Sequence, residues 1–377
     1  MNIAKVVVLL GSFFGRTSLG SLMLAVFLLS QEITKSYSVA GFMIGAVTFG
    51  IGLGRLIQGR LVDEFGPRRV LISFTTVHFF LICIYSNKYA VLIDSKTIYV
   101  LAALVGITSP ATSPIARYLF SLISHRANMR YMHVIESTNN EVAFLIGPLL
   151  GILIYRNFPN PTAILILGSF NTLGGLILGI SFASKKWVKI ANENQVDFFK
   201  AIKPFLLFGF MGGIAGGLVE VAVPALAINA QKIHLTNWLF ASWAFGAIVG
   251  GSLASIFEKY FAVRLRFIIG VYLLALSAFL LSFTNFFLLI YLILFIHGIP
   301  SVIVWASNYA MSDSVIIESR KSEKYALIIA ISTMGGAFGS ATGGQLLDNY
   351  GTSVVFICAG TVFLILASLA SFQKTKI

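Results

Sequence analysis

A few charged side chains interrupt long apolar stretches of this sequence, and their types point to chemistry. Arg16, Glu141, Glu220 and His297 each lie near the middle of an apolar run. An arginine binds anions or carboxylates through its fork of N–H donors, whereas a carboxyl or an imidazole takes up and releases protons. We therefore take these four residues as candidates for solute binding or proton coupling.

Three of these candidates also have a structural interpretation. Arg16 and Glu141 can pair with each other, which would offset the roughly 2.5–3.5 kcal/mol that an arginine costs in an apolar medium. A single histidine in an apolar helix is more often a satisfied packing residue than a functional one, and this applies to His297. Both interpretations stay open on the sequence alone.

A polar interruption lies within another apolar run. The segment Thr108-Ser-Pro110-Ala-Thr112-Ser-Pro114 contains two prolines. Proline removes a backbone donor and breaks a helix, and an interrupted helix at membrane depth can expose polar groups to a cavity. We expect a broken helix here, with carbonyl groups that can face a cavity.

Motifs for other kinds of chemistry are missing. The sequence has no glycine-rich loop followed by Lys-Ser or Lys-Thr, no zinc-ligand spacing and no nucleophile elbow. Its two cysteines, Cys83 and Cys358, lie inside apolar runs and are expected to be free thiols. We therefore expect neither an enzyme nor a bound metal or cofactor.

The elements that carry these residues must lie in a membrane. Of the 377 residues, 57% are hydrophobic and 11% are charged, whereas soluble domains carry about 25% charged residues. Too little polar surface exists for water, so the lipid bilayer must be most of the solvent. Because lipid offers no partner for open backbone groups, the spans must be helices.

Twelve apolar stretches reach the ~20 residues that a span requires. The polar stretch Ser184–Lys200 separates six from six. This predicts an all-α membrane protein with an N-terminal half at 1–183, a central cytoplasmic loop at 184–200 and a C-terminal half at 201–377. The expected spans are Val6–Leu28, Val39–Gln58, Val70–Ser86, Ile98–Tyr118, Met132–Tyr155, Thr162–Ala183, Ala201–Ile228, Asn237–Phe257, Phe267–Phe283, Phe286–Ala310, Tyr325–Leu347 and Ser353–Phe372.

The basic residues give the orientation. If both termini are cytoplasmic, 20 of the 27 Lys and Arg residues fall on the inner side and five on the outer side. Cytoplasmic segments of membrane proteins carry this excess. The net charge of +13 is thus explained by topology, and we expect no nucleic-acid partner.

Small residues recur at matching places in the two halves. In the fifth span a stripe with a spacing of four lets two helices approach closely, and Pro148 adds a local break in hydrogen bonding. At an offset of 192 residues the same spacing recurs in the eleventh span, and at an offset of 197 Gly54 falls on Gly251. These matches predict two pseudo-symmetric halves. The stripe residues are Ala143, Gly147 and Gly151 in the first half and Gly335, Gly339 and Gly343 in the second.

A charged motif follows the second span on the inner side. It reads Gly59-Arg-Leu-Val-Asp63-Glu-Phe-Gly66-Pro-Arg68-Arg69. The glycines permit a tight turn, and Asp63 can pair with an arginine or face the positive end of a helix. An ordinary charged turn is the plainer interpretation.

This motif resembles the signature of the major facilitator superfamily of secondary transporters, and the span count, central loop and half-repeats fit that family. The resemblance implies alternating access around a central site lined by the first, fourth, seventh and tenth spans. The residues carried over to that site are Arg16, Thr108, Thr112, Glu220 and His297. It also implies that Asp63 stabilises the outward-facing state, with Gly59, Gly66, Arg68 and Arg69 shaping the loop.

The fifth-span stripe partly resembles the antiporter motif of efflux members. It favours export of a small organic or amphipathic compound, driven by an ion gradient, most simply of protons. Import of a sugar, organic acid or nucleoside is the main alternative, and a non-transporting membrane receptor or assembly partner is another. We expect a monomer in the plasma (inner) membrane, with the bilayer and a small-molecule substrate as partners.

Overall fold

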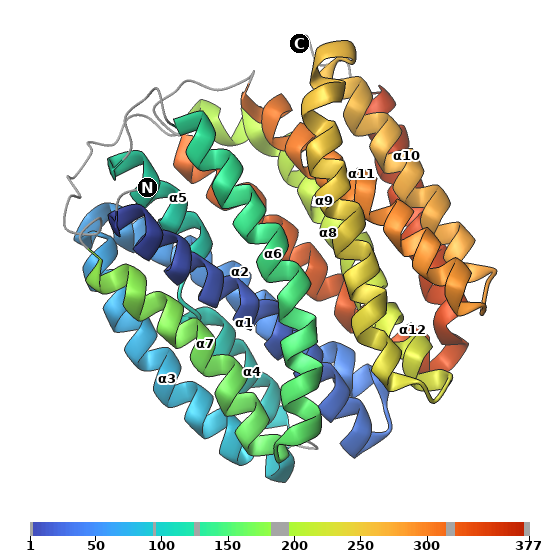
Figure 1. The fold of residues 1–377 in the computed structure, drawn as a ribbon, viewed down its shortest axis with the longest axis horizontal. Coiled ribbons are helices and arrows are strands. Elements are labelled where there is room, and N and C mark those ends of the chain that lie inside the picture. The colour runs from blue at the N-terminus through green and yellow to red at the C-terminus, as the bar shows by residue number, and fades with distance from the viewer. Residues whose placement is uncertain (1–2, 93–95, 124–128, 182–195, 314–320, 373–377) are drawn as a thin grey trace. The chain divides into compact units, whose positions relative to one another are not determined.

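The computed structural model describes residues 3–92, 96–123, 129–181, 196–313 and 321–372 of the chain. Within these residues every regular element is a helix and none is a strand (Figure 1). The helices are α1 (Ile3–Thr34), α2 (Tyr37–Phe65), α3 (Pro67–Leu92), α4 (Lys96–Thr108), α5 (Thr112–Ile123), α6 (Met129–Asn157), α7 (Asn160–Ile180), α8 (Val196–Asn229), the short 3-10 helix η3 (Ile233–Leu235), α9 (Thr236–Tyr260), α10 (Val263–Ser282), α11 (Phe287–Asp313) and α12 (Lys321–Phe372).

These helices account for the twelve expected spans. Within the described residues, nine segments are long and apolar enough to cross a membrane, with α4 and α5 counted as one span, Lys96–Phe120. The long α12 contains two of the expected spans, because Gly351 leaves the helical conformation with φ 78° and ψ −178°. The fifth and eighth expected spans correspond to α6, whose apolar part is Val142–Asn157, and to α9. The central stretch Ser184–Lys200 lies largely outside the described residues.

The chain folds as two compact units. Unit 1 contains Met1–Lys35 and Ala46–Glu193, and unit 2 contains Ser36–Gly45 and Asn194–Ile377. A division at the central loop alone would place Ser36–Gly45 with the first half of the chain. These ten residues are instead part of unit 2, although α2 continues without a break into unit 1.

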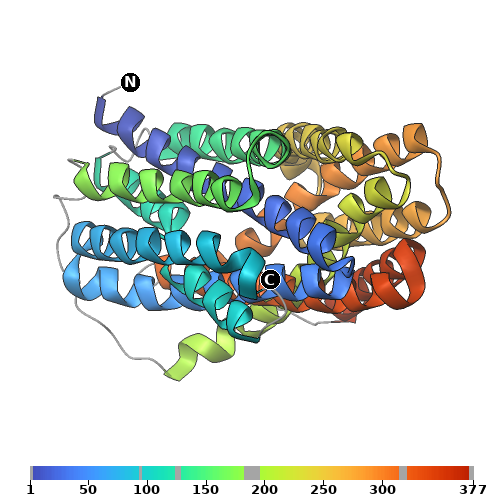
Figure 2. The same cartoon turned by 90° about the horizontal axis from the view of Figure 1, so that it is seen from below.

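In unit 1, α1 lies along α6 and α7, while α3 lies along α7 and α4. Figures 1 and 2 show these helices as long rods running side by side. Residues such as Val8, Leu71, Leu119 and Leu178 form the core between them and are almost fully buried. Since lipid is itself apolar, close packing rather than exclusion of water holds such helices together.

In unit 2, α8 lies along α12, α9 lies along α11, and α10 lies against both α11 and α12. The core of this unit is aromatic, and the rings of Phe208 and Phe267 stack with centroids 5.2 Å apart.

An acidic residue of unit 2 caps the start of α2. Asp348 accepts hydrogen bonds from the backbone N–H of Tyr37 and of Ser38, at 2.7 and 2.8 Å, and from the hydroxyl of Ser36 at 2.7 Å. The first N–H groups of a helix have no partner within the helix, and a carboxylate at this end also complements the helix dipole. The Tyr37 hydroxyl donates to Asn229 Oδ1 at 2.6 Å, which fixes the same segment to α8.

Candidate functional site

The expected break in the fourth span is confirmed. α4 ends at Thr108, α5 begins at Thr112, and Ser109–Ala111 between them is not helical. Pro110 has no N–H and cannot continue the ladder of helical hydrogen bonds. Ser109 closes α4 instead, because its N–H lies 3.1 Å from the carbonyl oxygens of both Val105 and Gly106.

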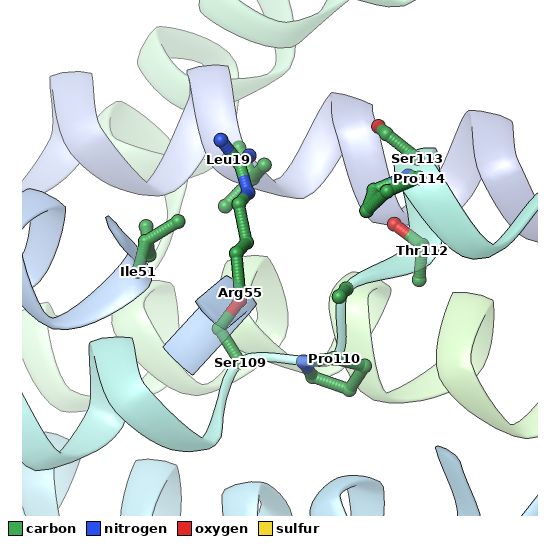
Figure 3. Close-up of a pocket in the computed structure, with 9 residues that line it drawn as sticks. Leu19, Ile51, Arg55, Ser109, Pro110, Thr112, Ser113 and Pro114 are labelled. Atoms are coloured by element: carbon green, nitrogen blue, oxygen red, sulfur yellow. The ribbon is translucent and has the colours of Figure 1, made fainter. Parts of the chain in front are cut away.

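A pocket of unit 1 opens at this break (Figure 3). Residues of the break and of the first turn of α5 line it together with side chains from α1 and α2. Among the described residues that line it, Arg55 is charged and none is acidic. In this structure the pocket is too narrow to enclose a solute. The lining residues are Leu19, Ile51, Arg55, Ser109, Pro110, Ala111, Thr112, Ser113 and Pro114.

Arg16 adds a second positive charge next to this pocket. It is 7% exposed, and its Nε donates a hydrogen bond to the Ser113 hydroxyl at 2.7 Å. The preceding Gly15 explains how α5 comes so near to α1, since a Cβ on that residue would overlap the Thr112 side chain. The structure thus brings two predicted residues, Arg16 and Thr112, to the same place.

Thr108 does not line this pocket. Its hydroxyl donates to the Leu104 carbonyl of its own helix at 2.9 Å, and it lies 3.5 Å from His78 Nδ1. Hydroxyls commonly satisfy themselves in this way within apolar helices.

Two amide side chains that the sequence interpretation left out hold the break in place. Gln58 of α2 is fully buried, donates to the Ser109 carbonyl at 2.8 Å and accepts from the Ala111 N–H at 2.9 Å. Asn171 of α7 donates to the Ser109 hydroxyl at 2.5 Å. The available signal was a buried amide opposite a proline break, where freed backbone groups need partners.

The two carboxyl candidates have different outcomes. The side chain of Glu141 lies outside the described residues, so its pairing with Arg16 stays a prediction. Glu220 lies on α8 and is exposed, although Val219 and Val221 on either side of it are fully buried. One turn earlier, Gly216 borders open space, because a Cβ there would meet no atom within 4 Å. This face of α8 is therefore open within unit 2.

His297 lies in the packed core of unit 2 rather than on an open face. It is 1% exposed, and its Nδ1 lies 2.7 Å from the Ser277 hydroxyl. The rings of Trp243 and Phe363 meet it edge to face, with centroids 5.3 and 6.1 Å away. This environment favours the packing interpretation of His297 over a cavity-lining one.

The charged motif is mostly helical. Gly59 and Asp63 belong to α2, and the turn proper is Gly66, which has a φ of 83° and separates α2 from α3. Its N–H bonds the Val62 carbonyl at 2.9 Å, and this ends α2. Asp63 is exposed and lies near the Tyr118 hydroxyl of α5.

Arg68 and Arg69 are exposed in the first turn of α3. Cations are unfavourable at that end of a helix, so these two arginines do not serve the stability of α3.

The glycine stripes pack helices in both units. In unit 1, a Cβ on Gly151 of α6 would lie 2.7 Å from the carbonyl oxygen of Ser21 on α1. A Cβ on Gly147 would lie 3.1 Å from the carbonyl oxygen of Thr17 on the same helix. Ala143, the third residue of the stripe, is fully buried. In unit 2, Cβ atoms on Gly335 and Gly339 of α12 would overlap carbonyl oxygens of α8, and one on Gly343 would lie 2.7 Å from the Val221 side chain.

The family of the chain follows from its sequence and is consistent with this architecture. The sequence profile of the Major Facilitator Superfamily matches residues 8–205 and 205–375. The chain therefore belongs to this superfamily. No curated protein sequence matches it significantly.

Solved structures share the fold at low sequence identity. The nucleoside transporter NupG has a TM-score of 0.72 and 12% identity, covering 98% of each chain. A mutant form of NupG has a TM-score of 0.75 and 10% identity, covering 98% of this chain and all of that one. The human organic anion transporter MFSD10 (TETRAN) has a TM-score of 0.70 and 11% identity, with the same coverage.

These findings confirm the predicted fold class of twelve helices in two six-helix halves. The chain is a multi-pass integral membrane protein and a transporter rather than an enzyme.

Proposed function

We propose that this transporter exports small organic solutes in exchange for protons and that it prefers solutes with a negative charge. The observation that carries the preference is the pocket at the α4–α5 break, with Arg55 in its lining and Arg16 bonded to Ser113 beside it. Guanidinium groups bind carboxylates, sulfonates and phosphates with paired N–H donors.

The local backbone supports the same charge preference. α5 starts at Thr112, so the positive end of its helix dipole lies at Thr112 and Ser113, which line the pocket. Hydroxyls and an arginine at the start of a half-helix form the kind of site that transporters build from interrupted helices. The solute would bind as this pocket widens during alternating access.

Glu220 is the proposed carrier of the coupling proton. It is a carboxyl group on a membrane-spanning helix, exposed beside the open space at Gly216. Ionisable groups at membrane depth are costly and mark ion or proton pathways. Glu141 is the alternative carrier, and Arg16 the residue that would respond to its charge.

Export is supported by the α6 stripe, which resembles the antiporter motif of efflux members. We further propose that the protein resides in the plasma membrane as a monomer with both termini cytoplasmic, as the distribution of Lys and Arg indicates.

Transport assays in liposomes test this function directly. The purified protein is reconstituted with its cytoplasmic side facing outward, and the lumen is made acidic. Two permanently charged probes of similar size are offered, the anion benzenesulfonate and the cation phenyltrimethylammonium. We expect accumulation of the anion that depends on the pH gradient. Uptake only when the gradient is reversed would replace export with import, and accumulation of neither probe under either gradient would contradict the proposal.

Two substitutions test the proposed roles of Arg55 in solute binding and of Glu220 in proton coupling. Arg55→Gln is expected to reduce benzenesulfonate transport by more than tenfold, because a charged hydrogen bond of about 1.5–3 kcal/mol is lost, while Arg60→Gln on the exposed inner end of the same helix leaves it unchanged. Glu220→Gln is expected to abolish accumulation driven by the pH gradient but to preserve exchange of labelled for unlabelled solute, with Glu64→Gln as the control.

A further inference from the structure

The hydrogen bonds of Gln58 fill a specific gap in the α4–α5 break. In a continuous helix, the N–H of Ala111 would donate to the carbonyl of Ile107, four residues earlier. In this structure Ala111 N–H donates to Gln58 Oε1 at 2.9 Å, and Gln58 Nε2 lies 3.4 Å from the Ile107 oxygen and 2.8 Å from the Ser109 oxygen. One side-chain amide therefore stands in for the peptide partners on both sides of Pro110.

The approach of α2 to α4 places this amide at the break. Gly54 packs directly on the Ile107 carbonyl, and a Cβ in its place would overlap that carbonyl. Gln58 follows one turn later on the same face of α2, and the i, i+4 relation aims it at the residues that follow Ile107. Arg55 lies on the same side of the helix, three residues before Gln58.

The chemistry of the gap selects an amide. The break presents one N–H and two carbonyl oxygens to a residue with no exposed surface. Only a side chain that both accepts and donates satisfies this set. An ionised glutamate accepts but does not donate, and leucine does neither; each would leave buried backbone groups without partners, which is costly.

We infer that Gln58 is a positioning residue of the transport site. It fixes the backbone of Ser109–Ala111 and, through it, the direction in which Thr112 and Ser113 at the start of α5 present their hydroxyls to the pocket. Because it stands on the helix that also carries Arg55, the charged side chain and the broken backbone move together when α2 moves. This inference rests on the proposed assignment of the pocket as the solute site.

The test combines a structural readout with a transport readout. Amide hydrogen exchange of the segment 109–115 is measured by mass spectrometry in the full-length protein, for the wild type and for Gln58→Leu, Gln58→Glu and Gln58→Asn. Benzenesulfonate transport gives KM and the maximal rate for the same proteins. Gln345→Leu, the same chemical change at an exposed position of α12, is the matched control.

We expect Gln58→Leu to speed exchange in 109–115 at least tenfold, since a buried hydrogen-bond partner is worth about 1–3 kcal/mol, and to leave exchange in unit 2 unchanged. KM should rise about tenfold with a smaller change in maximal rate. Gln58→Glu should restore KM partly at acidic pH, where the protonated carboxyl regains a donor, and Gln58→Asn should fall between wild type and leucine.

Each contrary result has its own meaning. Unchanged hydrogen exchange in 109–115 after removal of the amide would show that the Gln58 hydrogen bonds do not hold this backbone segment in place. Faster exchange with an unchanged KM, while Arg55→Gln still raises KM, would leave the pocket as the solute site and overturn the positioning role. Faster exchange with neither substitution affecting KM would show that the solute binds elsewhere, and would overturn the inference together with the proposed site.

Discussion

Each unit contains two helix pairs that pack through glycines. One pair is packed in the same way in both units, and the other is packed more closely in unit 2 than in unit 1. In unit 1, α2 meets α4 through Gly50, Gly54 and Gly106, and a Cβ on any of them would overlap backbone of the facing helix. Unit 2 repeats this arrangement where α9 meets α11. The glycines there are Gly246, Gly250 and Gly298.

The second pair consists of α1 and α6 in unit 1 and of α8 and α12 in unit 2, and the distance between its helices differs. In unit 2, glycines stand on both helices, and Cβ atoms on Gly213 and Gly217 of α8 or on Gly335 and Gly339 of α12 would each overlap a carbonyl oxygen of the facing helix. In unit 1 the α6 stripe faces Thr17, Gly20 and Ser21 of α1, and the clearances are several tenths of an ångström larger. The same spacing of small residues therefore gives direct contact between backbones in unit 2 and a looser interface in unit 1. The looser interface involves α1, the helix that carries Arg16.

The largest effect is expected where α8 and α12 touch. Gly339→Ala places a Cβ on the Ile214 carbonyl, a rigid backbone atom, so the helices must separate. We expect a loss of about 3 kcal/mol or more in the free energy of unfolding, the upper range for overpacking, seen as aggregation or a strongly lowered Tm in detergent. Gly336→Ala is the matched control on the same helix, since its nearest atom would be 3.7 Å away. Equal Tm values for the two variants would contradict this close packing.

A smaller effect is expected where α6 meets α1. Gly151→Ala brings a Cβ to 2.7 Å from the Ser21 carbonyl, and we expect a loss of about 1–2 kcal/mol with the protein still folded. Gly20→Ala, with 3.6 Å to its nearest atom, should keep the wild-type Tm. If Gly151→Ala proved as damaging as Gly339→Ala, the two interfaces would be equally tight and the contrast between the units would be wrong.

Gly147→Ala should be milder still. Its Cβ would lie 3.1 Å from the Thr17 carbonyl and 3.4 Å from Gly20 and Ser21, distances that a slight shift of α1 relieves. We expect a loss below about 1 kcal/mol, which a gain in helix propensity partly offsets. A melting curve measured beside that of Gly151→Ala gives the ranking, and a reversed order would contradict it.

The smallest effect is expected at glycines that pack on nothing. A Cβ added to Gly216 in α8 or to Gly59 in α2 would meet no atom within 4 Å, so alanine should stabilise either helix by up to about 1 kcal/mol. A lowered Tm for either variant would indicate that a neighbouring segment occupies that space.

Hydropathy predicted most of the fold, because the length and the apolar character of the spans follow directly from the bilayer as solvent. The exact residue-to-residue correspondence between the two halves was harder to predict. The sequence pairs Gly54 with Gly251, but Gly250 is the residue packed on a carbonyl, that of Ile299, as Gly54 is packed on that of Ile107. Adjacent glycines look alike in a sequence, and only the packing distinguishes them.

The arrangement around the helix break was predicted in part. The prolines fixed the break, and intramembrane charge singled out Arg16. Its contact with Ser113 and the role of Gln58 depend on how α1, α2 and α4 come together, which no local pattern contains. His297 illustrates the converse, since a polar residue in an apolar run can be satisfied by one neighbouring hydroxyl, here that of Ser277.

The division of α2 between the units has a mechanical consequence. Its first residues are held by the Asp348 cap and by close contacts of Gly41 and Gly45 with α12, while the rest is bound to α4. A transport cycle that reorients the two units would therefore require α2 to bend near Ala46 or its first turns to leave unit 2. Release of these turns would break the hydrogen bonds to Asp348 and the bond from Tyr37 to Asn229, as well as the packing of Gly41 and Gly45 on α12.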